Sequence, residues 1–145
     1  MNTTVISTMV IGVMLAAALA WFLLWRKRPR RLNNEYFQKE WQDLQKSLRN
    51  KQQWAGAVLH ADKLLDEALK KKRVGGRSMG ERMVKAQKLF TDNDGAWFGH
   101  KLKSKIDAEP TLGLKEVEVK QALLGIRQAL KDIGALRSDI PRSQK

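Results

Sequence analysis

Two patterns of apolar and polar residues divide the chain. From residue 5 to residue 25 no side chain is charged, and the apolar residues are continuous rather than periodic. After residue 33, apolar residues recur every three or four positions among charged ones, which is typical of amphipathic α-helices. No stretch alternates apolar and polar residues over the length of a strand. The pattern predicts an all-α protein, with one long apolar helix followed by a small antiparallel helical bundle.

Five helices are expected within residues 33–136, a length sufficient for one small domain. The apolar spacing places them at about these ranges: 34–49, 52–72, 78–90, 95–108 and 114–136. Gly134 follows the last apolar stripe and is expected to end the last helix. The polar tail at 137–145 has no such stripe, so we expect it to be disordered.

Residues that favour helix ends lie between these ranges. Asn33 or Asn34 can cap the first helix of the bundle, because both side chains accept hydrogen bonds from backbone N–H groups. Ser78 and Glu81 have the spacing of a capping box, which predicts a helix that begins there. Gly75-Gly76 follows four consecutive cations and is expected to end the preceding helix.

The uncharged run at 5–25 predicts a membrane-spanning helix. At about 1.5 Å per residue it is long enough for a hydrocarbon core of roughly 30 Å. Trp21 and Trp25 lie at its carboxyl end, where indole rings favour the membrane interface. A linker at 26–32 follows, with these cations: Arg26, Lys27, Arg28, Arg30 and Arg31. The positive-inside rule then predicts a single-pass cell-membrane protein with residues 1–4 outside and the bundle in the cytosol.

The chain is strongly basic, with a formal net charge of +13 and no cysteine. The absence of cysteine fits a reducing compartment. Removing the linker cations still leaves a basic bundle, which suits anionic lipids or a phosphate-rich partner. The densest local group consists of Lys70, Lys71, Lys72, Arg73 and Arg77. This group either contacts phosphates of lipid or nucleic acid or forms a solvated turn, and it lacks the pattern of a P-loop.

Candidate catalytic and metal-binding chemistry is sparse. His60 and His100 are the only histidines, and neither has a second histidine or a glutamate one helical turn away. The sequence therefore predicts no metal site and no cofactor, and each ring is expected to be partly buried and hydrogen-bonded. Asp92 and Asp94 lie where helix capping accounts for them. The tryptophan and phenylalanine residues of the bundle are expected in its core.

The segment 94–110, with the helix at 114–136, resembles an uncharacterised family of small bacterial membrane-anchored proteins. Its helical part is similar to the HEPN superfamily. In those relatives the segment reads W-x-x-H-K-x-R-N-x-x-x-H-E-P, and the stretch at 61–69 recurs in the second helix. The resemblance covers about residues 36–136 and implies a HEPN-like bundle.

HEPN ribonucleases use an Arg-x(4–6)-His motif, and the resemblance implies that this motif is degenerate here. Lys103 stands at the arginine position, Ser104 at that of the usual asparagine, and Ala108 at that of the histidine. An alanine methyl cannot supply the acid-base help of an imidazole. His100 precedes the cation instead of following it. We therefore expect the HEPN-like fold without the ribonuclease activity.

These observations together predict a membrane-anchored, non-catalytic helical binding or scaffolding module. Its expected partners are membrane lipids and another protein. Homodimers are common in the HEPN superfamily, so the resemblance leaves a homodimer open. Two alternatives are a membrane-tethered nucleic-acid-binding protein and, less favoured, a ribonuclease in which His100 and Lys103 replace the damaged motif.

Overall fold

The computed structural model describes residues 3–26 and 31–138, with side chains over 8–24 and 31–138. The chain divides into two compact units, Met1–Arg30 and Arg31–Lys145, each considered by itself. Every regular element among the described residues is a helix, which confirms the all-α prediction.

The first unit contains helix α1, Thr3–Arg26, which includes the whole predicted span at 5–25. Every described side chain of α1, at 8–24, is exposed, and apolar residues occupy all sides of the helix instead of one stripe. Within the described side chains, no helix meets the length and apolarity required to cross a bilayer. The remaining parts of the predicted anchor region, residues 1–2 and 27–30, lie outside the described residues.

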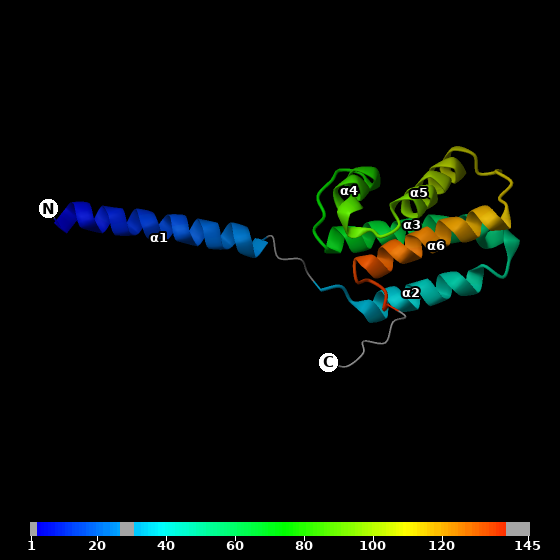
Figure 1. The fold of residues 1–145 in the computed structure, drawn as a ribbon, viewed down its shortest axis with the longest axis horizontal. Helices are drawn as coiled ribbons and strands as arrows, with labels where there is room; N and C mark the ends of the chain where they lie inside the picture. The colour runs from blue at the N-terminus through cyan, green and yellow to red at the C-terminus, as the bar shows by residue number, and fades with distance from the viewer. Residues whose placement is uncertain (1–2, 27–30, 139–145) are drawn as a thin grey trace. The chain divides into compact units, whose positions relative to one another are not determined.

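The second unit is a bundle of five α-helices, as the apolar periodicity predicts (Figure 1). Its helices are α2 (Asn34–Ser47), α3 (Trp54–Lys71), α4 (Met79–Ala86), α5 (Asn93–Ala108) and α6 (Glu116–Asp132). Two short 3₁₀ turns, η1 (Lys51–Gln53) and η2 (Gln87–Leu89), precede α3 and follow α4. Helix α3 packs against α2, α4, α5 and α6 and is therefore the centre of the bundle.

The predicted apolar stripes form the core. Phe37, Trp41 and Leu44 of α2 are buried. The buried stripe of α6 consists of Val119, Leu123, Ile126 and Leu130. Trp54, Trp97 and Phe98 pack against this core but remain half-buried. The expectation that the tryptophan and phenylalanine residues belong to the core holds for Phe37, Trp41 and Phe90, and the other three lie at its edge.

Side chains cap three of the helices as expected. Asn33 Oδ1 accepts from the backbone N–H of Tyr36, which settles the choice between Asn33 and Asn34. Ser78 Oγ accepts from the N–H of Glu81 at the start of α4. Asp92 Oδ1 likewise accepts from the N–H of Gly95 and caps α5.

The end of α3 differs from the prediction. The backbone takes its left-handed turn at Arg73, with φ 61°, and not at the glycine pair that follows. The N–H groups of Arg73 and Val74 donate to the carbonyls of Lys70 and Leu69, which completes a Schellman motif. Gly134 forms the same motif after α6 with φ 76°, and there the prediction is confirmed.

Glycines allow α5 and α6 to cross closely. A methyl group on Gly125 of α6 would collide with the backbone of Gly95 in α5. A methyl group on Gly99 would lie 2.7 Å from the side chain of Ile126. The two helices therefore approach to a distance that only glycine permits at these positions.

We expect Gly125→Ala to lower the free energy of unfolding by about 1–3 kcal/mol, because α5 and α6 must move apart to accept the methyl group. Gly56→Ala is the matched control, since nothing lies within 4 Å of a methyl group at that helical position. The control should gain up to about 1 kcal/mol from helix propensity. Urea unfolding of both variants, followed by circular dichroism, measures the difference. Equal stabilities would contradict the close crossing.

Candidate functional site

Two of the five cations predicted to contact phosphates are paired with carboxylates of α3. Lys70 Nζ lies 2.7 Å from Asp66 Oδ2, and Lys71 Nζ lies 2.8 Å from Glu67 Oε1. Lys71 also lies over the ring of Tyr36, at 4.7 Å from its centroid. The remaining three are placed as follows: Lys72 caps α3, Arg73 occupies the left-handed turn, and Arg77 is exposed before α4. Contact between this group and phosphates stays a prediction.

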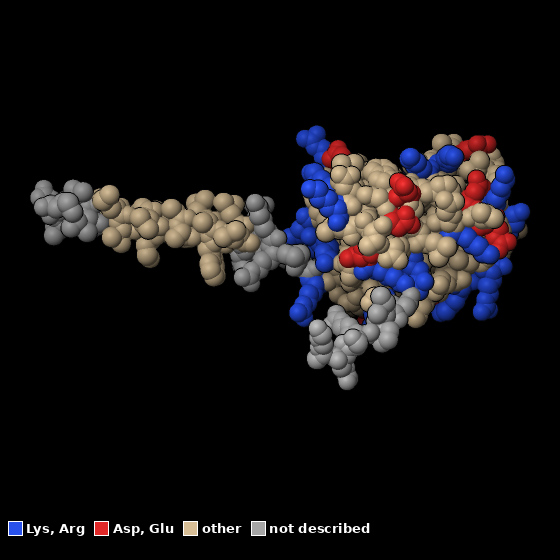
Figure 2. All heavy atoms as spheres, viewed as in Figure 1, with Lys and Arg blue, Asp and Glu red and all other residues tan. Residues whose placement is uncertain are grey.

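The visible face of the bundle carries charges of both signs. Figure 2 shows acidic side chains between the lysines and arginines of this face, while the described side chains of α1, at 8–24, carry no charge. Of the predicted interface residues, Trp21 and Arg31 are exposed. The side chains of Trp25 and Arg26, together with Lys27, Arg28 and Arg30, lie outside the described residues.

A polar cluster lies between α3, α4 and α5. Asp66 of α3 accepts from Arg82 Nε of α4 at 2.6 Å, and Arg82 Nη1 donates to the carbonyl of Gly76. The Arg82 side chain is only 8% exposed, so this ion pair is largely removed from water. Burial raises the pKa of Asp66, but hydrogen bonds from Arg82 and Lys70 outweigh this effect and keep the pKa below its ordinary value.

His100 of α5 belongs to the same cluster. Its Nδ1 lies 2.8 Å from Oδ1 of Asp62, a carboxylate of α3 whose side chain is 5% exposed. The ring also contacts Trp97 edge to face. Because a carboxylate accepts, Nδ1 is the donor in this contact, and in the neutral form of the ring the lone pair then lies on Nε2.

The degenerate motif positions are spread along α5. Lys103 Nζ lies 2.6 Å from Oδ2 of Asp107. The Asp107 hydrogen bond and the nearby charges of Asp62 and Asp66 raise the pKa of Lys103. Ala108 is exposed at the last position of the helix. The structure therefore brings His100 and Lys103 near the same acidic residues and leaves Ala108 apart from them.

The second histidine is also paired with a carboxylate. His60 Nε2 lies 3.0 Å from Oε2 of Glu40 in α2. Both histidines are thus partly buried and hydrogen-bonded, as expected. Among the described residues, no group of three or more histidine, cysteine or acidic side chains is arranged to hold a metal ion.

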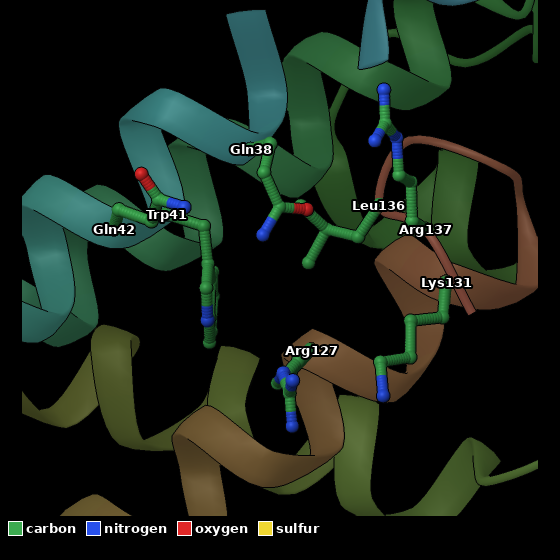
Figure 3. Close-up of a pocket in the computed structure, with 7 residues that line it drawn as sticks. All are labelled: Gln38, Trp41, Gln42, Arg127, Lys131, Leu136 and Arg137. Atoms are coloured by element: carbon green, nitrogen blue, oxygen red, sulfur yellow. The ribbon is translucent and has the colours of Figure 1, made fainter. Parts of the chain in front are cut away.

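A hollow of about 240 Å³ opens between α2 and α6 (Figure 3). Its lining residues are Gln38, Trp41, Gln42, Arg127, Lys131, Leu136 and Arg137. The side chains of Gln38 and Trp41 extend from α2, and Arg127 and Lys131 extend from α6 on the opposite side. Asn34 Nδ2 donates to the carbonyl of Gly134 at 2.8 Å, which holds the start of α2 against the end of α6 beside the hollow.

Sequence reasoning missed this hollow and the Asp66–Arg82 pair. Arg127 and Lys131 are four positions apart and therefore share a helix face, which is a signal visible in the sequence. Trp41 was expected only as a core residue. No sequence signal shows that α2 lies opposite the cationic face of α6, because that placement comes from packing alone.

We expect Asp66→Asn to lower the free energy of unfolding at pH 7 by about 2 kcal/mol, because Arg82 then loses its buried counter-ion. The folded state binds the Asp66 proton more weakly than the unfolded state, so the carboxylate stabilises the fold above its ordinary pKa of 3.8. That stabilisation is lost as the pH falls below this value. Urea unfolding as a function of pH should show the two proteins converging in acid.

Asp43→Asn is the matched control for this comparison. Asp43 pairs only with Lys46 on the same helix, and both side chains are substantially exposed, at 48% and 71%. Its replacement should leave the stability close to that of the unmodified protein, because an exposed ion pair contributes little. Equal effects of the two substitutions would show that the Asp66 pair contributes no more than a surface pair.

Comparison of the chain with models of protein families, with curated proteins and with solved structures found no match.

Proposed function

We propose that the protein is a membrane-anchored helical binding module without catalytic activity of its own. The observation that carries this proposal is the uncharged run at 5–25, which is followed by five cations at 26–31. The described part of α1 supports it, because apolar side chains are exposed on every side of that helix. A helix that is apolar all round requires an apolar environment, either a protein interior or a bilayer.

In this proposal α1 crosses the cell membrane, and the cations of the linker hold the bundle on the cytosolic side. The linker at 26–32 is short, so in this proposal the bundle works at the membrane surface. Trp21 and Trp25 lie at the interface, and the linker cations contact anionic headgroups at about 1 kcal/mol each. Resemblance to the HEPN-like family remains a prediction that fits this arrangement.

We propose that the bundle is not catalytic because the charged groups of the polar cluster are paired with one another. Asp66 pairs with Arg82 and Lys70, and Lys103 pairs with Asp107. The Asp66–Arg82 pair joins α3 to α4, and the other two pairs lie within one helix, so each of these charges already has a structural partner. The bundle then acts by binding a partner at the membrane, for which a protein is the favoured class.

Alkaline carbonate washing of membranes from expressing cells tests the anchor. We expect the full-length protein to remain in the membrane pellet and a variant lacking residues 2–26 to appear in the supernatant. A full-length variant with Val13→Arg and Leu15→Arg should also be released, because each arginine costs about 3 kcal/mol at the bilayer centre. The control variant carries Val13→Leu and Leu15→Ile and should stay in the pellet. Release of the unmodified protein would reject the anchor.

The His100–Asp62 pair favours one second candidate, a membrane-tethered ribonuclease. A buried carboxylate on Nδ1 orients an imidazole so that Nε2 can accept a proton, and Lys103 on the same helix could stabilise phosphate charge. In this alternative His100 is the general base for attack by a ribose 2′-hydroxyl.

Incubation of the purified protein with labelled RNA decides this candidate. If it is correct, cleavage should fall by about 10²- to 10⁴-fold in His100→Ala and clearly in Lys103→Ala. His60→Ala is the matched control, since His60 also pairs with a carboxylate but lies on α3 against Glu40. Cleavage that is the same in all variants comes from a contaminant and rejects the candidate.

A further inference from the structure

The hollow between α2 and α6 is lined by hydrogen-bond donors and positive charge. Arg127, Lys131 and Arg137 contribute three cations, and no acidic side chain belongs to the lining described by the structure. Gln38 and Gln42 add carboxamide groups, each of which has two N–H donors. A lining of this composition favours an anionic ligand over a cationic one.

The unpaired indole N–H of Trp41 is a second argument for a ligand and does not depend on the charges. Its side chain is buried, at 3% exposed, and its indole Nε1 has no hydrogen-bond partner. The indole N–H can only donate, and an unpaired buried donor costs roughly 1–3 kcal/mol. Trp41 lines the hollow, and its ring extends toward the space between the two helices (Figure 3). An acceptor bound in the hollow would satisfy it.

The number and kind of donors favour phosphate over a carboxylate. A phosphate monoester carries up to two negative charges and three acceptor oxygens, which matches a guanidinium, an ammonium group and an indole N–H. Arg127 and Lys131 are one helical turn apart and present their cations from the same side. Both residues also interact elsewhere in the chain, so the ligand adds to their contacts instead of supplying all of them.

The hollow is also rigid at one edge. The hydrogen bond from Asn34 to the carbonyl of Gly134 fixes α2 against the turn that ends α6, and Leu136 beside that turn is buried. The helices that carry the donors are therefore held together before a ligand arrives.

We propose that this hollow binds a phosphate monoester group, with Arg127 and Lys131 as its charge partners and the Trp41 indole as a donor. The group belongs either to a lipid headgroup or to a soluble phosphate compound. This inference names a ligand class for the binding module proposed above, but it does not require α1 to cross a membrane. Failure of the carbonate test would leave it intact, and its own failure would leave the anchor intact.

The test uses the full-length, ¹⁵N-labelled protein in maltoside micelles, which contain no phosphate. The indole N–H signal of Trp41 is assigned as the one that disappears in Trp41→Phe. Titration with inorganic phosphate at constant ionic strength should move this signal to a saturating end point, and the same ionic strength of chloride should not move it. A signal that does not move, or that moves without saturation, overturns the proposal.

Variants at the charge partners make the test specific. Arg127→Gln and Lys131→Gln should each weaken phosphate binding by about tenfold or more. Lys101→Gln is the control, because it removes one exposed cation from α5 and Lys101 does not line the hollow. Circular dichroism checks that every variant is folded. Equal affinities in all three variants would overturn the assignment of the site.

Two further arms identify the source of the phosphate. The protein is placed in nanodiscs of phosphatidylcholine alone or with phosphatidic acid, without added phosphate. A Trp41 shift that requires phosphatidic acid assigns the site to a lipid headgroup. A shift that appears only with soluble phosphate assigns it to a soluble compound. If neither phosphatidic acid nor inorganic phosphate moves the signal, the proposal is wrong.

Discussion

The burial of α3 is the constraint on which the bundle depends. This helix contacts four others, and its buried apolar residues are Ala57, Val58, Ala61, Leu64, Leu65, Ala68 and Leu69. They recur every three or four positions with adjacent pairs and form one broad apolar face, which several neighbouring helices cover together. The other four helices therefore assemble around α3, and each contributes one apolar stripe.

The same constraint explains the polar cluster. Asp62 and Asp66 lie one turn apart on α3 and enter the bundle together with its apolar face. A carboxylate removed from water requires charged or hydrogen-bonding partners. Arg82 of α4 and His100 of α5 supply them, so α4 and α5 are held against α3 by specific pairs as well as by apolar contacts. The electrostatic pairs and the packing thus select the same arrangement.

Most of the fold was accessible from the sequence because its signals are local. Apolar spacing located all five helices of the bundle, and short-range capping chemistry located their ends, as at Ser78 and Gly134. The end of α3 was predicted to within one residue, but the residue that ends it was not, because Arg73 adopts the left-handed conformation for which glycine is the usual residue. The sequence alone does not show that a non-glycine residue adopts this unfavourable backbone conformation here.

The candidate sites were less accessible, because they depend on which helices lie side by side. The His100–Asp62 pair joins residues 38 positions apart, and the hollow combines α2 with the end of α6. Sequence reasoning treated His100 and Trp41 separately, as a hydrogen-bonded ring and a core residue. Both descriptions are correct, but neither identifies the neighbours in space, which are Asp62 for His100 and the cations of α6 for Trp41.

The hydrogen bond between Asn34 and Gly134 has a topological consequence. It joins the first residue of α2 to the turn after α6, so the chain enters and leaves the bundle at one place. A domain whose two ends meet in this way can be inserted into a surface loop of a host protein, or circularly permuted, without stretching either connection. The geometry of the bundle therefore allows a short loop to join its two ends in an insertion or a circular permutation.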